Sequence, residues 1–332
     1  MWKYLIKTTA CLSLFGLALS SQALADKRKL TIYSYDSFVS EWGPGPQIEA
    51  AFEANCECDL VFVGLDSSIG ILGRAQMEAS APKADILLGL DTNLMTRAEA
   101  TGLLAPHGTT LSHDNLPVDF ASDIFMPVDW GYFAFVYDKN RLASPPMSFE
   151  ALVNSDLTIA IQDPRTSTPG LGLLMWVKSV YGNEAADYWQ QLQPRILTVT
   201  KSWWDAYSLF LEGEADMVLS YTTSPAYHAI AEGKDNYAAA SFTDGHYMQV
   251  EVAAMLKDAP QPDLAKSFMQ FIQTAEFQTI IPTTNWMYPT LKSATPDGFK
   301  GLVSPAKSHL FSAKAAEEGR QLFVDEWLKA SQ

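Results

Sequence analysis

The chain has 332 residues, of which 38 are acidic and 23 are basic, so its formal net charge at pH 7 is −15. An acidic protein of this kind repels the phosphate backbone, so we do not expect nucleic acid as a partner. The length favours two lobes over one core, because single hydrophobic cores stop growing at roughly 250 to 300 residues.

The first 25 residues have the pattern of a cleaved secretory signal peptide. Lys3 and Lys7 provide the positively charged start, residues 11–20 the apolar stretch, and residues 23–25 a small-residue cleavage site. No later stretch reaches the roughly 18 to 20 apolar residues of a membrane-spanning helix. We therefore expect an exported, soluble protein whose mature chain begins near Asp26. The signal holds two lysines and no acid, so the mature net charge would be −17.

The start of the mature chain alternates short apolar runs with longer amphipathic stretches. This alternation predicts strands at residues 30–34, 60–63 and 86–90, with helices at residues 47–54 and 69–79. Strands that alternate with helices in this way are typical of α/β layers with a mostly parallel sheet. We interpret this part of the chain as the opening of a doubly wound lobe.

Two cysteines remain after removal of the signal, Cys56 and Cys58, with only Glu57 between them. A disulfide is plausible in an oxidising compartment, although its loop would be very small. The alternative is a pair of free thiols at the start of a strand. The spacing does not suit a zinc site.

Two long runs rich in β-forming residues, at 128–137 and 247–256, exceed the length of an ordinary connector. We predict that they cross between the two lobes, one outward and one returning. The remaining predicted elements are strands at 157–162 and 217–220, helices that begin at Pro169 and Pro225, and closing helices at 264–274 and 313–328.

The predicted division of the chain follows from these crossings. It assigns residues 1–25 to the signal peptide, residues 26–127 to lobe 1 with 247–290 returning to it, and residues 128–246 to lobe 2 with 291–332 packing back on it.

Two short runs, residues 162–172 and 220–227, place hydroxyl groups directly before a proline that starts an apolar segment. Ser167 and Thr168 precede Pro169, and Ser224 precedes Pro225. A hydroxyl at the N-cap followed by proline at the first helical position is typical of a helix start. The free N–H groups and the helix dipole there favour a phosphate or a carboxylate. Ordinary helix capping is the alternative interpretation.

Aromatic residues on predicted loops form a second candidate set. Their faces stack on flat heterocycles and attract a delocalised cation, while packing inside the core is the alternative role. The set comprises Tyr35, Trp42, Trp203, Trp204, Tyr221, Tyr227, Trp286 and Tyr288. Together with the hydroxyl runs, these residues indicate a ligand with an anionic end and a flat ring that can carry positive charge.

Signatures of catalysis are missing from the sequence. It contains no His-Glu-x-x-His, no Gly-x-Ser-x-Gly and no phosphate-binding loop with Gly-Lys-Ser or Gly-Lys-Thr. Gly170 and Gly172 begin a Gly-x-Gly, but the third glycine of a dinucleotide fingerprint is absent. We therefore expect no catalytic residue, no metal and no cofactor, and any ATP hydrolysis would have to come from a partner.

Six segments resemble those of the periplasmic thiamine-binding proteins, which are substrate-binding components of thiamine ABC importers within the bacterial extracellular solute-binding protein family. They are residues 35–38, 42–46, 162–172, 220–228, 235–238 and 285–289. The resemblance implies an α/β, two-lobed periplasmic binding protein fold of the type II kind, with the ligand cleft between lobes joined by two crossover strands. It also implies a periplasmic protein that closes on thiamine, thiamine monophosphate or thiamine diphosphate. The ligand would then pass to an inner-membrane permease driven by a cytoplasmic ATPase.

The resemblance also implies ligand contacts. Around the phosphate or hydroxyethyl end it places Ser167, Thr168, Trp203, Tyr221, Thr222, Thr223 and Ser224, and around the rings Tyr35, Trp42, Tyr227 and Trp286. After the second strand the family tends to have an acidic residue followed by glycine, whereas this chain has Asp66 followed by Ser67 and Ser68. Loss of that glycine could narrow the approach of the backbone to a phosphate. Ser67 and Ser68 could instead donate hydrogen bonds from the start of the next helix.

Two other functions are less consistent with the sequence. A binding protein for another solute such as ferric iron would share this architecture, but iron carriers use adjacent tyrosines and Tyr221 is followed by Thr222. An enzyme acting on thiamine phosphates is disfavoured by the absence of a nucleophile motif or a metal cluster.

Overall fold

The computed structural model describes residues 27–331, so the predicted signal segment lies outside the described residues. Within that range, no helix combines the length and the apolar character needed to cross a membrane.

The first lobe is built on three parallel strands with helices between them. Strand β1 pairs with both β2 and β3 in parallel. All six residues of β3 are buried, as expected for an inner strand of a sheet covered on both faces. Elements of this part are β1 (Arg28–Tyr35), α1 (Asp36–Val39), α2 (Gly45–Glu53), β2 (Cys58–Leu65), α3 (Ser68–Met77), β3 (Ile86–Asp91), α4 (Met95–Ala100) and β4 (Leu104–Ala105). The three strands and two helices predicted here are confirmed.

Cys56 and Cys58, the first residue of β2, are joined by a disulfide, with their Cα atoms 5.3 Å apart. The structure thus favours the disulfide over the pair of free thiols.

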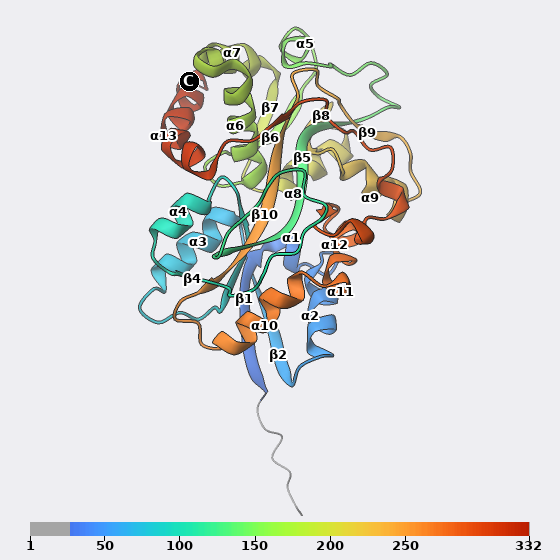
Figure 1. Cartoon of the computed structure of the whole chain (residues 1–332). Coiled ribbons are helices and arrows are strands. Elements are labelled where there is room, and N and C mark those ends of the chain that lie inside the picture. Colours follow the sequence, from blue (N-terminus) through green and yellow to red (C-terminus); the bar gives the residue numbers. More distant parts are fainter. Residues whose placement is uncertain (1–26, 332) are drawn as a thin grey trace, which may run out of the picture.

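Two long strands connect the lobes, β5 (Phe125–Asp138) and β10 (His246–Leu256), as predicted. Residues 125–132 of β5 pair with β10, whereas residues 133–137 pair with β8 (Met217–Tyr221) of the second lobe. The strand order along the sheet is β2-β1-β3-β10-β5-β8-β6-β7. Figure 1 shows β5 and β10 running from the lower lobe into the upper one. The sheets of the two lobes are therefore joined through these two strands.

The second lobe repeats the α/β pattern around β8. Strand β6 pairs in parallel with β7 and with β8. Its other elements are α5 (Phe149–Val153), β6 (Ile159–Gln162), α6 (Thr168–Tyr181), α7 (Ala185–Leu192), β7 (Ile196–Thr200), α8 (Trp203–Glu212), α9 (Ser224–Ala231) and β9 (Tyr237–Ala239).

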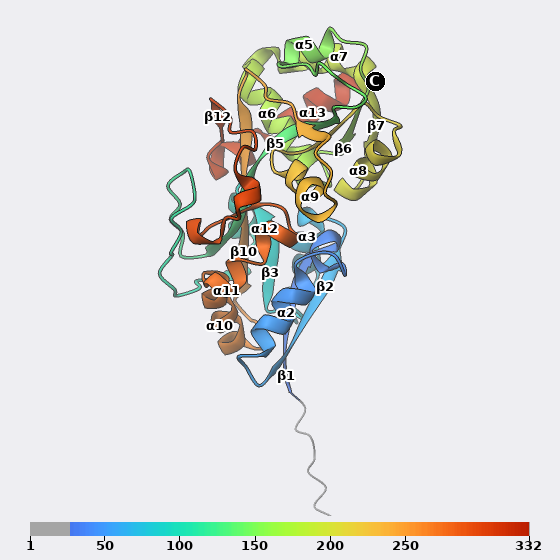
Figure 2. The same ribbon diagram turned by 90° about the vertical axis from the view of Figure 1, so that its right-hand side faces the viewer.

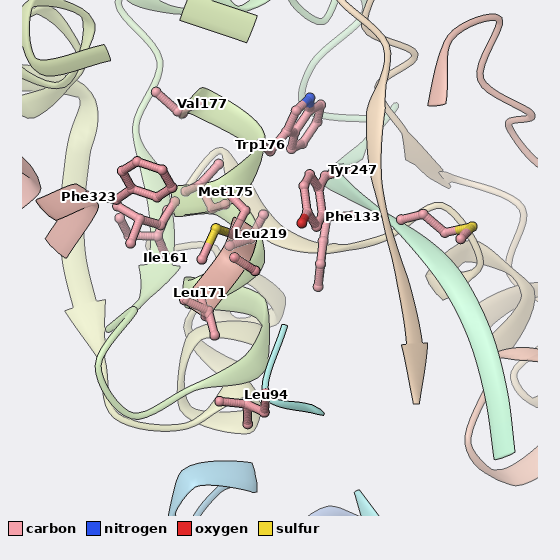
Figure 3. Close-up of a cluster of buried hydrophobic side chains, with 14 of the residues drawn as sticks. Leu94, Phe133, Ile161, Leu171, Met175, Trp176, Val177, Leu219, Tyr247 and Phe323 are labelled. Carbon is pink, nitrogen blue, oxygen red and sulfur yellow. The ribbon is translucent and has the colours of Figure 1, made fainter. Parts of the chain in front are cut away.

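Helix α6 lies in the centre of the second lobe's core. Every residue from 169 to 177 is buried, which fits a helix whose sequence is apolar on all sides. Figure 3 shows Leu171 and Met175 of α6 gathered with Ile161 and Leu219 from the adjacent strands.

The C-terminal part returns to both lobes. It comprises α10 (Pro262–Ile272), α11 (Ala275–Gln278), α12 (Ile281–Thr284), β11 (Tyr288–Pro289), β12 (Ser308–His309) and α13 (Ala313–Ala330). Helix α13 packs against α6 and α7 and also against α4. Arg97 of α4 forms a two-pronged ion pair with Glu317 of α13, with N···O distances of 2.8 to 3.0 Å. The division at residues 127, 246 and 290 stays a prediction.

Gly170 and Gly172 let the start of α6 approach the sheet closely. A Cβ atom on Gly170 would overlap the backbone of Gln162 and Asp163, and one on Gly172 would overlap the ring of Phe133. The Gly-x-Gly spacing thus serves the packing of a helix on a sheet.

Gly170→Ala should lower the melting temperature by several degrees, because overpacking a core costs about 1 to 3 kcal/mol. For a protein of this size, 1 kcal/mol corresponds to roughly 2 to 4 °C. The matched control is Gly73→Ala in α3, where nothing lies within 4 Å of the added Cβ. Differential scanning calorimetry should show the control melting at or above the wild-type temperature. Equal melting of the two variants would contradict this account of α6.

Candidate functional site

Predicted ligand residues from the two lobes meet at the carboxyl ends of the parallel strands, where α/β proteins bind ligands. Helix α3 follows β2, and α6 follows β6. The hydroxyls of Ser68 and Thr168, the first residues of these helices, lie 2.5 Å apart in a hydrogen bond between the lobes. Both side chains therefore face the same place, although 100 residues separate them in the chain.

The three helix starts use their hydroxyls differently. Ser67 caps α3, since its Oγ accepts a hydrogen bond of 3.1 Å from the backbone N–H of Gly70. Ser167 is the N-cap of α6 and Thr223 the N-cap of α9, and neither side chain makes a capping hydrogen bond. The hydroxyls of Ser167 and Thr223 therefore do not cap α6 and α9.

The predicted register of these starts needs a correction. In α6 the first helical residue is Thr168, and in α9 it is Ser224, so each proline occupies the second helical position and Ser224 is not the N-cap. Proline fits there as well as at the first position, because the first N–H groups of a helix have no partner within the helix.

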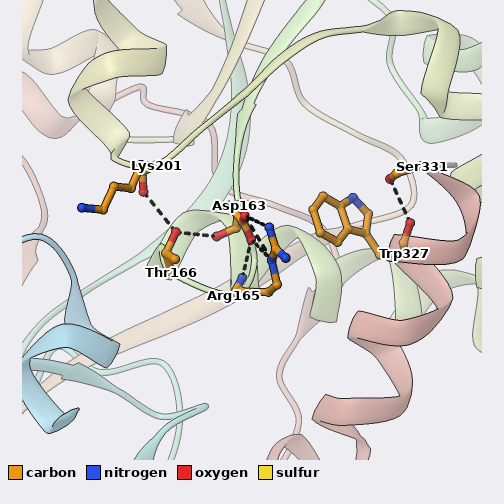
Figure 4. Close-up of polar contacts among 6 residues, drawn as sticks. All are labelled: Asp163, Arg165, Thr166, Lys201, Trp327 and Ser331. Carbon is orange, nitrogen blue, oxygen red and sulfur yellow. Dashed lines mark hydrogen bonds and ion pairs between the residues drawn. The ribbon is translucent and has the colours of Figure 1, made fainter.

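The run before α6 is held from both sides, as Figure 4 shows. Arg165 donates to both carboxylate oxygens of Asp163, with Nε 2.9 and 3.1 Å from them. The Thr166 hydroxyl donates to the backbone carbonyl of Lys201 at 3.3 Å. The Arg165 guanidinium also lies 5.7 Å from the ring centre of Trp327 in α13. These contacts fix the position of Ser167 and Thr168.

Trp203 begins α8 and is fixed on two sides. Its ring stacks on Tyr207 at 4.9 Å between centroids, and its indole N–H donates to the Ser220 hydroxyl at 2.9 Å. The hydroxyls of Ser220 and Ser224 are 2.8 Å apart. The start of α8, the end of β8 and the start of α9 thus form one connected group.

Two contacts join the lobes at an exposed edge of this site. Trp42 and Trp204 are 51% and 47% exposed, and their ring centroids are 5.4 Å apart. Asp66, just before α3, forms an ion pair with Lys201, just before α8. In Figure 2 the second lobe, with α8 and α9, lies above the first lobe, with α2 and α3. The two lobes are therefore in contact where Trp42 was predicted to meet a ligand.

Tyr35 and Tyr221 extend over the crossover strand β10. Tyr35 donates its hydroxyl proton to Glu251 at 2.9 Å, and the Asn285 amide donates to the Tyr35 oxygen at 3.1 Å. Tyr221 donates to the Gln249 side chain at 2.8 Å. Gln249 and Glu251 are two positions apart on one strand, so their side chains share a face.

The turn after α12 brings two more predicted residues together. Trp286 has a φ of 57°, a left-handed conformation that a bulky residue rarely adopts. Its ring meets Tyr227 edge-on, with centroids 5.3 Å apart. Such strain is often found where a side chain is held for a ligand.

Of the remaining predicted residues, Thr222 and Thr223 are buried beside this turn, and Tyr288 is half-buried. Thr222 donates its backbone N–H to the Tyr132 carbonyl at 2.8 Å, and the Thr223 hydroxyl lies 3.9 Å from the Met287 sulfur. Tyr288 instead stacks on Trp130 at 4.5 Å, which is a packing role.

Sequence reasoning missed a group of buried acids at the same boundary. Glu251 of β10 is paired directly with Asp91 of β3 on one side and with Asp129 of β5 on the other. Directly opposed residues in antiparallel strands point to the same face. All three are at most 4% exposed. A sequence signal existed, since each acid lies within or directly after a predicted apolar strand.

The environment of these acids favours their protonated forms. Burial raises the pKa of Asp129 to about 7 and that of Asp91 to about 6. Burial and the nearby charge of Asp129 also raise the pKa of Glu251 well above its usual value. Asn285 partly offsets the rise in the pKa of Asp129, because its side-chain amide donates a hydrogen bond of 2.7 Å to that carboxylate.

Comparison with known proteins shows the family. The model of the family described as bacterial extracellular solute-binding protein matches residues 44–279. A protein named thiamine-binding periplasmic protein, from Escherichia coli, is 50% identical over 322 residues, which cover 96% of this chain and 98% of the relative. A protein of the same name from Brucella abortus is 48% identical and covers 98% and 97% of the two chains.

A solved structure titled periplasmic thiamin binding protein superposes with a TM-score of 0.89 and 50% identity, and covers 92% of this chain and 97% of that one. Because the fold, the sequence identity and the coverage of both chains agree, the chain belongs to the bacterial extracellular solute-binding protein family.

Proposed function

We propose that this protein is the periplasmic substrate-binding component of an ABC importer and that its ligands are thiamine and thiamine phosphates. The observation that carries the proposal is the meeting, at one boundary between the lobes, of the helix starts of α3 and α6 with aromatic rings and buried carboxylates. Thiamine has matching parts, which are a hydroxyethyl group that can carry phosphate, a flat thiazolium cation and an aminopyrimidine ring. The identity of about 50% to proteins named thiamine-binding supports this ligand.

The helix starts of α3 and α6 suit an anionic end. Each carries a partial positive charge, and the Ser68–Thr168 hydrogen bond holds the two close together. The positive ends of the two helices repel each other when they lie close together. A phosphate between the two helix starts would be attracted by both of them. The hydroxyls of Ser167 and Thr168 would then donate to phosphate oxygens. This arrangement supports binding of thiamine monophosphate and diphosphate as well as thiamine.

The aromatic residues suit the rings. Trp203 is already held by Tyr207 and Ser220, so little side-chain entropy is lost when a flat ring stacks on it. Tyr35, Tyr221, Tyr227 and Trp286 complete the aromatic side of the proposed site.

The proposed cycle is opening and closing of the lobes about β5 and β10. Closure brings Trp42 onto Trp204 and Asp66 onto Lys201, the two contacts that join the lobes at the exposed edge. The closed protein would deliver its ligand to an inner-membrane permease with a cytoplasmic ATPase. Export to the periplasm would use the signal segment at residues 1–25. The relatives are named as binding proteins, so the proposal includes no catalytic step.

The variant with both Ser167→Ala and Thr168→Ala should bind thiamine monophosphate at least tenfold more weakly, while thiamine affinity falls much less. The physical reason is that a hydrogen bond to a charged group contributes about 1.5 to 3 kcal/mol, roughly twice that of a neutral pair. Isothermal titration with the two ligands in parallel measures the difference. Ser179→Ala in the last turn of the same helix is the control, because its hydroxyl bonds only to the Trp176 carbonyl among its described partners. Equal losses for both ligands would show that the run only supports the helix.

A further inference from the structure

The boundary between the lobes contains carboxylates that no described cation neutralises. Asp129 is fully buried, and Glu251 is 4% exposed. Within residues 27–331, neither Oδ1 of Asp129 nor Oε1 of Glu251 has a hydrogen-bond partner. Burying two unpaired negative charges side by side is costly, so the ligand-free site must hold protons or await a cation.

The groups that act on this pair come from three strands, the turn after α12 and one helix. They are Tyr35 of β1, Asp91 of β3, Tyr221 of β8, Asn285 after α12 and, acting on Asp91, Arg320 of α13. Arg320 lowers the pKa of Asp91 only partly, since burial dominates there. In the part of the chain that the structure describes, no cation offsets burial for Asp129 or Glu251.

The two acids are linked by hydrogen bonds to aromatic residues of the proposed site. Tyr35 donates a hydrogen bond to Glu251 directly. It also accepts one from Asn285, whose side-chain amide in turn donates to Asp129. Asn285 immediately precedes the strained Trp286, whose ring meets Tyr227. Carboxylates beside aromatic rings are the combination that binds a flat organic cation.

We propose that Asp129 and Glu251 form the subsite for the positive charge of the ligand, and that the ligand enters by exchange for a proton that this pair shares. This inference rests on the proposed function. One proton leaves the carboxyl pair for solvent as the cation arrives, so the charge of the buried site is conserved. Exchange of this kind selects cationic ligands, because a neutral analogue would leave the pair protonated and its oxygens without a charged partner.

Two measurements on the whole mature protein test the exchange with thiamine as the probe. Isothermal titration at pH 6.5 in Pipes, Mes and Bis-Tris buffers should give heats that differ with the ionisation heat of the buffer, showing release of about one proton. Affinity should rise about tenfold or more between pH 5.5 and 7.5, the range in which a group of pKa about 7 loses its proton.

The variants Asp129→Asn and Glu251→Gln should bind thiamine at least tenfold more weakly at pH 7.5 and release far less proton. Asp85→Asn is the matched control, because Asp85 is a buried acid that accepts hydrogen bonds from the backbone of Thr31 and Gln261 within the first lobe. This control should keep the wild-type proton release. Circular dichroism identifies any variant that fails to fold, and the two wild-type measurements stand without variants.

The outcomes separate the two claims. Tight thiamine binding with heats independent of buffer and affinity independent of pH would overturn the exchange but leave the receptor function intact. Wild-type proton release retained in both acid variants would also overturn it. No thiamine heat at any pH would overturn the proposed function itself.

Discussion

Trp203→Ala should weaken thiamine binding at least tenfold. The Trp203 ring is positioned for a ligand by its stacking on Tyr207 and by the hydrogen bond from its indole N–H to Ser220. A cation over such a ring gains about 0.5 to 2 kcal/mol, and stacking of flat rings adds about 0.5 to 1.5 kcal/mol. A loss of 1.4 kcal/mol is tenfold in the dissociation constant. The substitution also releases the Ser220 hydroxyl, which holds the start of α9 through Ser224.

Titration calorimetry with purified variants measures the effect. Trp203→Phe is the control, since it keeps a stacking face and loses the indole N–H, and it should fall between the wild type and the alanine variant. Unchanged affinity in the alanine variant would assign Trp203 to packing of the second lobe.

The second large effect concerns stability without ligand. Asp129→Asn should raise the melting temperature at pH 8 by about 10 °C, and by less than half as much at pH 5. A carboxyl group whose pKa is raised on folding makes the folded state bind more protons than the unfolded state between the two pKa values. The free energy of unfolding therefore falls as pH rises through that range.

For Asp129 the range runs from the ordinary 3.8 to about 7. Each pKa unit corresponds to about 1.4 kcal/mol, so the ionised group costs on the order of 4 kcal/mol above pH 7. Asparagine carries no charge and can still accept the hydrogen bond from Asn285. Melting curves at pH 5, 6.5 and 8 should show the gap between variant and wild type opening with pH. Asp258→Asn, at an exposed position, should show no such gap. A gap that is constant across pH would contradict the buried charge.

Much of the fold follows from local patterns. The apolar runs at 30–34, 60–63 and 86–90 alternate with amphipathic stretches, and the structure places strands and helices there. The two crossover strands were predictable because 128–137 and 247–256 exceed the length of an ordinary connector. Patterns of this kind depend only on neighbours in the chain, which is why they can be predicted from one sequence.

The site could be predicted only in part. The hydroxyl runs mark the starts of α6 and α9, but the helices begin one residue away from the simplest expectation, because proline is tolerated at two positions. The acids Asp91, Asp129 and Glu251 were missed because their meeting depends on the register of β3, β10 and β5. That register is set by pairing between strands more than a hundred residues apart, and no local pattern encodes it.

The most direct test of the account is isothermal titration of the mature protein with thiamine, thiamine monophosphate and thiamine diphosphate in parallel. We predict tight binding of one ligand per protein, with the phosphate forms ranked by their contacts at the starts of α3 and α6. Absence of heat with all three ligands, in a sample shown to be folded, would contradict the account and direct the search to other flat cations.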